Sequence, residues 1–547
     1  MTEKRMTPVP IALRAAISIL AALALAGLSA RGASQQKSQD RQAARIIIPN
    51  IDDDDGDGLP DFTASSPRAV QDDELLLVHV DPEAVLPRGA RLTADVPATW
   101  RSFIRIFALD ASDGVFRLFK EPMELNGEEA GRRGLDLALE SSAFAGPGRA
   151  RDFEIGFCFR TKDGALISRK VMAFSVAPFV MSSCLDPVEA VHVVHTKLTE
   201  GFAADLRPLV EAAGARLLAF ENAALAEHDI WIQDATEIGR ATDGEKRMRV
   251  ALHGNRGIPL DDLFAKSFLG KDSGVVHPGS FRGKTAEWID WFGNLEVSPP
   301  LKVGDRSYPH GRIYSGTQGL RAMHPEVIGF LEAQGVQAPV LRLDTSWLII
   351  GHVDETVSWV PSDVGNAFRM LVPSPRLALE ILREAVEASP GCTLNRGTKR
   401  ADSEKDEYCD ASVTSVLNDR ALLADQEFVQ KKIDGVRRTL QAELGIAAAD
   451  VVEIPVLFNS WPGRYAGRYG ALTTNMVNSL LIGKTLVVPD PHGPLVDGTD
   501  VLLKAVKDRL EPLGCKIVAI DDFYPYHRFA GEVHCGTNAT RLPVASR

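Results

Sequence analysis

The hydrophobic pattern of this chain changes near Pro178, and that change constrains the fold more than any other feature of the sequence. Before it, short runs of alternating apolar and polar residues recur between clusters of Gly, Pro and Asp. These runs lie at 75–80, 103–107, 153–157 and 171–176. Alternation with period two is typical of strands that bury one face. Residues 46–180 are therefore predicted to form a β-sandwich.

After Pro178 the sequence favours an α/β domain, because stretches with helical periodicity alternate with short apolar segments. The expected helices lie at 202–215, 325–334, 377–388 and 425–444, and the expected strands at 347–350, 451–457, 479–482 and 516–520. A polar insert at 389–411 is predicted to be a surface loop. Its cysteines, Cys392 and Cys409, can pair in an oxidising compartment, but their spacing leaves the pairing open.

Composition narrows the class of protein. A chain of 547 residues with 45% hydrophobic and 24% charged residues is an ordinary globular protein of two to four domains. It is not a collagen-like rod, a mainly disordered chain or a polytopic membrane protein. The 61 basic and 73 acidic residues give a net charge of −12, which argues against a nucleic-acid partner and suits a cationic substrate or metal cations.

The N-terminus has the pattern of an export signal. Lys4 and Arg5 precede an apolar run at 15–28, and small residues follow that run. The run is shorter than the roughly 20 residues that a membrane span needs. We therefore predict a signal peptide over 1–30 and a linker over 31–45, with an uncleaved anchor as the alternative. The mature protein is expected to be secreted or periplasmic, with no stable membrane insertion after cleavage.

An acidic segment at 50–61 contains six aspartates. Carboxylates at this density repel one another unless a cation lies among them. The alternate spacing of Asp53, Asp55 and Asp57 before Gly58 matches that of calcium-binding loops. The spacing does not decide between this register and the one through residues 52 and 54. A solvated acidic linker is the alternative.

Candidate catalytic residues occur in three short motifs: WIQD at 231–234, GHVDE at 351–355 and HCGTN at 534–538. They supply Cys535 as a thiolate nucleophile, His352 as a proton carrier, and Asp234 and Asp354 as carboxylates. Two carboxylates can bind both sides of a planar guanidinium and leave its carbon facing the thiolate. The set therefore fits substitution at a guanidine better than peptide hydrolysis. Taken alone, a single His or Cys of this kind is more often structural.

Together with NRG at 255–257 and FGNLEVSPP at 292–300, these motifs resemble the protein-arginine deiminase family in the family's own order. The resemblance runs from about residue 46 to the C-terminus. It implies a pseudo-fivefold α/β-propeller catalytic domain at 181–547, preceded by an immunoglobulin-like, calcium-binding β-domain at 46–180. Animal members carry two such β-domains, and this chain has room for one.

The resemblance also implies roles for the catalytic residues. Cys535 would attack the guanidinium carbon, and His352 would protonate the departing ammonia and then activate water. Asp234 and Asp354 would hold the guanidinium nitrogens.

The substrate-binding residues follow from the same resemblance. Trp231 would line the slot for the side-chain methylenes, and Arg256 would bind a substrate carbonyl, which favours peptidyl-arginine. Phe529 stands where some relatives have a substrate-contacting Arg. The adjacent Arg528 is expected to point differently, as neighbours on a strand do.

Calcium is the cofactor that the resemblance implies. The ligands expected near the active site are Gln233, Glu237, Phe292, Leu295 and Glu296. Those expected at the β-domain are Asn50, Asp52, Asp54 and Asp72, joined by Asp272 from the catalytic domain. Because Ala235 and Ala251 stand where relatives carry acidic ligands, we expect fewer ions here than in those relatives.

The predicted function is calcium-dependent hydrolysis of peptidyl-arginine to peptidyl-citrulline and ammonia, through a covalent Cys thiouronium intermediate. The partners would be arginine-containing proteins or peptides. One alternative is a deiminase or hydrolase acting on free arginine or another small guanidine such as agmatine. The other is a catalytically inactive calcium-binding surface module. Turnover of a capped arginine amide, compared with that of free arginine, distinguishes the three.

Overall fold

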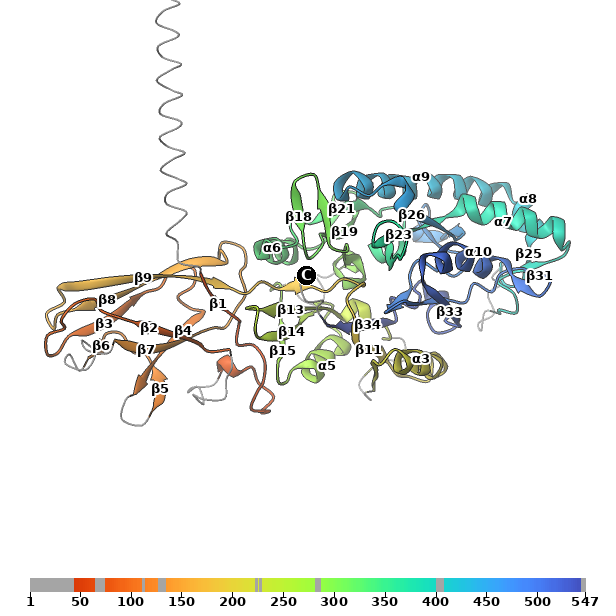
Figure 1. The fold of residues 1–547 in the computed structure, drawn as a ribbon. Coiled ribbons are helices and arrows are strands. Elements are labelled where there is room, and N and C mark those ends of the chain that lie inside the picture. Colours follow the sequence, from red (N-terminus) through yellow and green to blue (C-terminus); the bar gives the residue numbers. More distant parts are fainter. Residues whose placement is uncertain are drawn as a thin grey trace, which may run out of the picture.

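The computed structural model describes residues 44–63, 74–110, 114–125, 134–221, 225, 229–280, 287–399 and 408–542. A lobe made of strands lies beside a larger lobe in which helices surround several small sheets (Figure 1). Across these ranges, the helices are all too short or too polar to cross a membrane. The predicted signal peptide and nearly all of the predicted linker fall outside the described residues.

The first lobe consists of two sheets that share one core. One sheet has the order β1 (Arg45–Ile47), β9 (Leu166–Val176), β8 (Asp152–Arg160), β3 (Arg91–Asp95) and β6 (Met123–Glu124). The other has the order β2 (Leu76–Val80), β7 (Leu135–Ser141), β4 (Ile104–Asp110) and β5 (Val115–Leu118). In β2 the buried residues Val78 and Val80 alternate with exposed Leu77 and His79, as the period-two pattern predicts.

Five sheets of three or four strands form the larger lobe. They are β10 (Val180–Met181), β13 (Thr236–Thr242), β14 (Arg247–His253) and β15 (Ser273–Val276); β12 (Arg216–Phe220), β11 (Val188–Val194) and β34 (Thr537–Arg541); β16 (Leu295–Val297), β19 (Ile313–Gln318), β20 (Arg321–Ala322) and β21 (Leu341–Asp344); β22 (Ser358–Pro361), β23 (Phe368–Ser374) and β26 (Val451–Pro455); and β29 (Leu480–Ile482), β30 (Thr485–Pro489) and β33 (Lys516–Ile520). The C-terminal strand β34 pairs antiparallel with β11, so the two ends of this lobe meet in one sheet.

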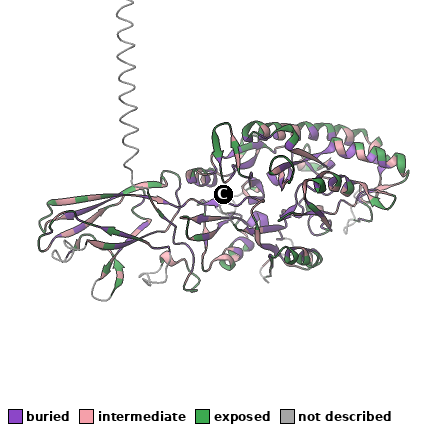
Figure 2. Ribbon diagram, in the orientation of Figure 1, coloured by how far each residue is buried: buried purple, intermediate pink, exposed green. Residues whose placement is uncertain are grey.

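The helices pack on the outside of these sheets (Figures 1 and 2). The longer ones are α3 (Glu200–Ala212), α5 (Pro259–Phe268), α6 (Pro325–Gln334), α7 (Pro375–Ala388), α9 (Arg420–Leu444) and α10 (Val501–Leu510). Asp419 caps α9 by accepting hydrogen bonds from the backbone N–H groups of Ala421 and Leu422, and Gly445 ends the helix in the left-handed conformation. The four helices expected from periodicity are confirmed: α6 has the expected ends, and the other three have at least one shifted end.

Two sequence-based predictions for this lobe are corrected by the structure. Residues 347–350 form an irregular turn and not a strand, because a short buried apolar run does not by itself specify a strand. Within the predicted loop at 389–411, β24 (Thr393–Leu394) pairs with β25 (Ala411–Ser412), which begins at its end. Cys392 and Cys409 are free thiols, as are the other four cysteines of the chain.

The acidic segment lies at the junction of the two lobes. Ile48 and Ile51, which flank its start, pack in the same core as Phe292 and Leu295 of the larger lobe. A methyl group at Gly274 in β15 would come within 2.5 Å of the Ile51 side chain, so the two segments approach closely. The segment is therefore held against the lobe that carries the candidate catalytic residues.

Candidate active site

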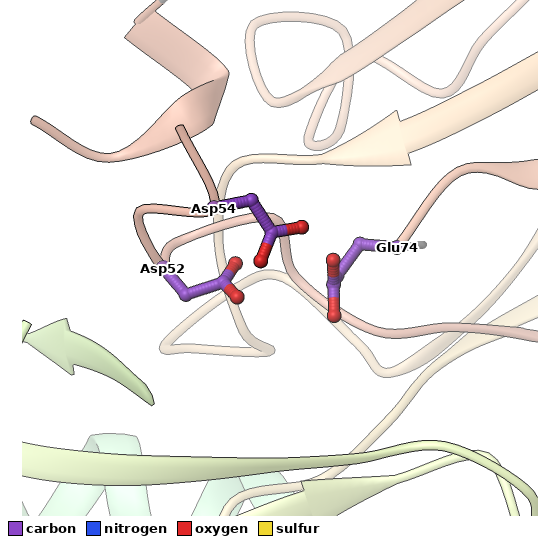
Figure 3. A group of neighbouring side chains, drawn as sticks. All are labelled: Asp52, Asp54 and Glu74. Carbon is purple, nitrogen blue, oxygen red and sulfur yellow. The ribbon is translucent and has the colours of Figure 1, made fainter. Parts of the chain in front are cut away.

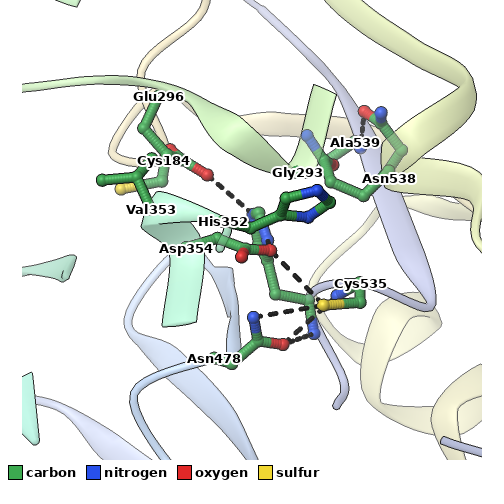
Figure 4. Close-up of polar contacts among 12 residues, drawn as sticks. Cys184, Gly293, Glu296, His352, Val353, Asp354, Asn478, Cys535, Asn538 and Ala539 are labelled. Carbon is green, nitrogen blue, oxygen red and sulfur yellow. Dashed lines mark hydrogen bonds and ion pairs between the residues drawn. The ribbon is translucent and has the colours of Figure 1, made fainter. Parts of the chain in front are cut away.

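Cys535 lies in the turn that leads into β34, and its position is set by Asn478. The backbone N–H of Cys535 donates to Asn478 Oδ1 at 3.2 Å, and Asn478 Nδ2 donates to the sulfur at 3.3 Å (Figure 4). The thiol also lies 3.4 Å from Asp354 Oδ2. No motif in the sequence identified Asn478, which is 57 positions away along the chain.

His352 precedes a single 3-10 turn, η5 (Val353–Glu355), and the Glu355 carboxylate accepts the His352 backbone N–H at 3.0 Å. The ring Nε2 lies 2.7 Å from the carbonyl oxygen of Trp288, and because a carbonyl only accepts, Nε2 carries a proton. The other ring nitrogen, Nδ1, lies 3.6 Å from Asp234 Oδ1. Nδ1 is therefore the atom that faces the candidate site and can exchange protons there.

The two aspartates and His352 converge on Gly293. The backbone N–H of Gly293 donates to Asp234 Oδ1 at 3.2 Å. A methyl group at Gly293 would lie 2.7 Å from His352 Nδ1, 2.8 Å from Asp234 Oδ1 and 3.4 Å from Asp354 Oδ2. Asp234, His352 and Asp354 are each at most 4% exposed. The structure thus brings these three predicted residues to one buried point, with Cys535 beside Asp354.

Burial and like charge determine the electrostatics of this site. Desolvation, followed by the charges of Asp354 and Asp234, raises the pKa of the Cys535 thiol well above its ordinary value. Burial also raises the pKa of Asp234, against the opposing effect of His352. A cation placed between the two carboxylates would favour their ionised forms and would lower the thiol pKa. The arrangement is therefore suited to a positively charged ligand that itself promotes formation of the thiolate.

Trp231 lies beside Cys535, and its role in lining the slot for the substrate stays a prediction. A methyl group at Gly531 would collide with the Trp231 ring and would lie 3.3 Å from the Cys535 Cβ. Trp231 packs on Tyr526 with ring centroids 5.7 Å apart. A small cavity of about 20 Å³ adjoins this point and includes Cys535, Asn478 and Gly531 among its lining residues.

Arg256 is near the site but is bound within the chain. Its Nε donates to Asp261 Oδ1 at 2.8 Å, and its guanidinium carbon lies 5.5 Å from the centroid of the Trp291 ring. The ring of Trp291 in turn lies 6.4 Å from that of His352. The Arg256 side chain is only 2% exposed. The sequence analysis did not identify Asp261 as its partner, and the substrate-binding role of Arg256 stays a prediction.

Phe529 and Arg528 do not lie on a strand, so the orientation argued for them from the sequence is wrong. They belong to a 3-10 turn, η9 (His527–Phe529), in which neighbouring side chains are not on opposite faces. The Arg528 guanidinium carbon lies 4.6 Å from the centroid of the Phe529 ring.

Three of the expected calcium ligands meet behind the catalytic residues. Gln233, Glu237 and Glu296 line one cavity of about 60 Å³. Gln233 Nε2 donates to Glu237 Oε2 at 3.1 Å. Burial, followed by the repulsion of Glu296, raises the pKa of Glu237, and burial raises that of Glu296 to about 7. Two buried acids facing one cavity fit a hard cation, because it would remove the cost of ionising them together.

Phe292 and Leu295, the other two expected ligands, are not among the residues that line this cavity. Both side chains are fully buried in the apolar core, so only the carbonyl groups of these residues are suited to bind a cation. Phe292 O already accepts the backbone N–H of Leu295, which leaves one lone pair.

The acidic segment gathers carboxylates in both registers. Asp52 and Asp54 join Glu74, with oxygens within 4.8 Å of one another (Figure 3). A second group of the same size is Asp53, Asp55 and Asp61. Burial and the charge of Asp54 raise the pKa of Asp52 to about 7, so this group also fits a cation. Asp57 belongs to neither group; its backbone N–H donates to Asp53.

The other residues expected at the β-domain site have different outcomes. Asn50 is buried, and its Nδ2 donates to Glu140 at 2.8 Å. Asp272 reaches the group through its backbone N–H, which donates to Asp52 Oδ2 at 3.0 Å, while its carboxylate belongs to neither group of oxygens. Asp72 lies outside the described residues. Glu74 was not identified from the sequence.

Comparison with known proteins gives matches to deiminases. The sequence model described as protein-arginine deiminase (PAD) matches residues 166–547. Protein-arginine deiminase type-4 of Mus musculus is 37% identical over 386 residues, covering 69% of this chain and 56% of that protein. Type-1 of the same species is 38% identical over 381 residues, covering 68% and 55%. The chain thus spans little more than half the length of these relatives.

One further relative and one solved structure complete the comparison. Protein-arginine deiminase type-4 of Homo sapiens is 35% identical over 387 residues, covering 70% of this chain and 56% of that protein. Among solved structures, the C. jejuni agmatine deiminase matches with a TM-score of 0.39 and 12% identity, over 68% of this chain and 98% of that one. This structural likeness is too weak to support an argument about substrate.

Proposed function

We propose that this chain, which belongs to the protein-arginine deiminase family, hydrolyses the guanidinium group of peptidyl-arginine to peptidyl-citrulline and ammonia. The observation that supports this most strongly is the convergence of Cys535, Asp354, His352 and Asp234 around Gly293. A nucleophile, a proton carrier and two carboxylates at one buried point are what substitution at a guanidinium carbon requires.

The two aspartates bind the substrate and activate the nucleophile. A guanidinium can donate paired N–H groups to Asp234 on one side and Asp354 on the other. Its charge offsets that of both carboxylates, which are the groups whose charges raise the pKa of Cys535. Substrate binding therefore lowers the pKa of the thiol and favours the thiolate beside the guanidinium carbon.

The reaction then proceeds in two substitutions. The Cys535 sulfur forms a bond to the guanidinium carbon, His352 Nδ1 gives a proton to one terminal nitrogen, and ammonia leaves a thiouronium on the cysteine. His352 next takes a proton from a water molecule, whose oxygen attacks the same carbon. Cleavage of the carbon–sulfur bond then releases the citrulline side chain and restores the thiolate.

Calcium is the cofactor of this proposal, and the chain offers two places for it. Gln233, Glu237 and Glu296 would hold one ion with the carbonyl groups of Phe292 and Leu295. The ligands of the other place would be drawn from Asn50, Asp52, Asp54, Glu74, Asp72 and Asp272. A bound ion would supply positive charge to buried carboxylates whose pKa values are raised.

The domain plan of the proposal follows the observed lobes. We assign residues 46–180 to an immunoglobulin-like β-domain, which the two sheets with one core support. We assign residues 181–547 to a pseudo-fivefold α/β-propeller, which the five sheets support. The basic and apolar pattern of residues 1–30 supports export, and arginine-containing proteins or peptides outside the cytoplasm would be the substrates.

A small guanidine, such as free arginine, is the second candidate substrate. One observation favours it: Arg256, the residue expected to bind the peptide backbone, is buried and paired with Asp261. An enzyme that reads the peptide backbone should prefer a capped arginine amide, whereas one specific for small guanidines should prefer the free amino acid.

The test is citrulline formation by the full chain under reducing conditions, with calcium or with chelator, from capped arginine amide and from free arginine. We expect calcium-dependent citrulline formation, faster from the amide. Faster turnover of free arginine than of the amide would show that the substrate is a small guanidine and not peptidyl-arginine. No citrulline from either substrate would contradict the proposed function and would favour an inactive calcium-binding module.

A further inference from the structure

His534 connects the proposed cation site to the catalytic carboxylate. Its Nδ1 lies 3.0 Å from Asp354 Oδ2, and its Nε2 lies 3.3 Å from Glu296 Oε1. Each ring nitrogen of His534 therefore faces one carboxylate oxygen. One imidazole therefore links an acid in the cation cavity to an acid in the active site.

The side chain of His534 is free to change partners, whereas its backbone is fixed. The backbone N–H donates to Asn478 Oδ1 at 3.1 Å, next to the bond that holds Cys535. The ring is 22% exposed, and among the described residues it makes its ion pairs with the two acids. Arg541, the other cation that lines the cavity, is held by the carbonyl oxygens of Asp186 and Leu481 at 2.9 and 3.1 Å.

Asp354 has one oxygen engaged and one available. Oδ2 receives both the His534 ring and the Cys535 thiol, at 3.0 and 3.4 Å. Oδ1 is buried and has no hydrogen-bond partner among the described residues. A guanidinium that binds Asp354 through both oxygens must therefore share or displace His534 at Oδ2.

We propose that His534 is a positioning residue through which a cation at Glu296 and Glu237 controls the availability of Asp354 to the guanidinium. Without the cation, the ring bridges Glu296 and Asp354. A cation at Glu296 competes with the ring for that carboxylate, which releases the ring to reorient and frees Asp354 Oδ2. This inference rests on the proposed function, because it needs a guanidinium ligand at Asp354.

Linkage makes the proposal measurable by binding alone. If the cation favours guanidinium binding through His534, the guanidinium must favour cation binding by the same factor. Removal of His534 should abolish that mutual effect. It should also tighten cation binding in the absence of guanidinium, because the ring no longer competes for the Glu296 carboxylate.

The experiment is calcium titration calorimetry of the full chain in a Cys535→Ser background, which prevents turnover. Each protein is titrated without ligand and with saturating capped arginine amide. The part of the calcium-binding heat that disappears in Glu296→Gln is assigned to the ion in the catalytic lobe. This assignment separates that ion from any other bound ion. Three proteins are compared in this background: His534 retained, His534→Ala, and His195→Gln as a control. His195 pairs with Glu221 and lines neither the cation cavity nor the cavity beside Cys535.

We expect the amide to lower the calcium Kd about fivefold or more when His534 is present. In His534→Ala the calcium Kd without amide and the calcium Kd with amide should coincide. The calcium Kd of this variant without amide should also be several-fold lower than that of the protein that retains His534. His195→Gln should keep the full effect. If His534→Ala does not fold, His534→Gln replaces it. Glutamine can make only part of the bridge between the two acids, so the ratio of the calcium Kd without amide to the calcium Kd with amide should be smaller than with His534 retained.

Three results would overturn the inference in distinguishable ways. An undiminished ratio in His534→Ala, or in His534→Gln where that variant replaces it, would leave the deiminase proposal intact and remove His534 from the coupling. If the calcium-binding isotherm of Glu296→Gln is identical to that of the protein with Glu296, no calcium binds at Glu296 and the proposed cation site is wrong. A protein that retains His534 and binds no amide would remove the proposed function, and this inference with it.

Discussion

The acidic segment of the first lobe and the active site of the second both gather carboxylates, but they assemble them differently. Asp53, Asp55 and Asp61 are close along the chain, and their grouping needs only a local turn. Asp354 and Cys535 are 181 positions apart and meet because β34, which follows Cys535, returns to pair with β11 near the start of the lobe. A local cluster can be recognised from spacing, whereas a distant one can be recognised only from the fold.

The two clusters also differ in what relieves their charge. The acidic segment brings carboxylate oxygens together in two groups, so a metal cation is a ligand that suits it. The active site adds a thiol, an imidazole and an apolar wall at Trp231, so an organic cation suits it better. Loss of one carboxylate should therefore affect stability in the first region and chemistry in the second, and the following predictions test that contrast.

The largest effect should come from the nucleophile. We expect Cys535→Ser to lower kcat/KM for capped arginine amide by about 10³-fold or more, since the Cys535 thiol is the one that contacts Asp354 Oδ2. Its Tm should stay close to that of the unsubstituted chain. Cys409→Ser, at a half-buried thiol in the second lobe, is the matched control and should keep full activity. Equal losses in both variants would contradict the assignment.

Gly293→Ala should lower the activity without removing any reactive group. The added methyl group would lie within 3 Å of both His352 and Asp234, so these groups must separate. We expect kcat to fall by about 10²-fold, as small displacements of catalytic groups commonly cause. Gly201→Ala in α3, where a methyl group meets nothing within 4 Å, should be neutral in the same steady-state assay.

At the acidic segment the expected effect is on stability. Calcium at about 100 times its Kd stabilises a binding protein by about 2.7 kcal/mol, or several degrees in Tm. Asp52→Asn should remove most of that calcium-dependent rise in differential scanning calorimetry. Asp57→Asn, at an exposed residue outside both acidic groups, should retain it. A full rise in Asp52→Asn would show that this group is not the site of stabilisation.

The smallest effect should come from a third buried acid pair, Asp522 and Glu532, which lies near the nucleophile. Burial raises the pKa of both, so the folded chain keeps protons that the unfolded chain releases above about pH 4 to 5. The folded state then binds more protons, and its stability should fall as pH rises from 5 to 8.

Because glutamine does not ionise, the Glu532→Gln variant should lose less stability as pH rises from 5 to 8. We expect the fall in unfolding free energy over this range to be smaller by about 1 kcal/mol, or 2–4 °C in Tm. Thermal unfolding in chelator at several pH values measures this slope. A Tm that rises with pH in the unsubstituted chain, or a slope unchanged in the variant, would show that the pair is ionised in the folded state.

The sequence predicted most of the candidate catalytic residues and less of their surroundings. Motifs singled out Asp234, His352, Asp354 and Cys535, and the structure places these four residues close together. Asn478, Gly293 and His534 contact residues far along the chain, which spacing does not reveal. His534 is part of a recognised motif, but its two partners lie in β16 and η5.

The fold shows the same limit. Helices with an apolar stripe and strands with alternation were predicted well, because their periodicity reflects one buried face. The run at 347–350 failed, since Trp347 and Leu348 are buried in a turn and burial alone does not define a strand. Arg528 and Phe529 failed because a single helical turn has no sequence period of its own.

Attack of Cys535 on the guanidinium carbon can be observed by trapping the covalent intermediate. The full chain would be mixed with calcium and capped arginine amide under reducing conditions, quenched rapidly with acid and analysed by peptide mass spectrometry. We predict an adduct on Cys535 with the mass of the substrate less ammonia, which decays as citrulline forms. Citrulline formation with Cys535 never modified, and unimpaired in Cys535→Ser, would contradict the account.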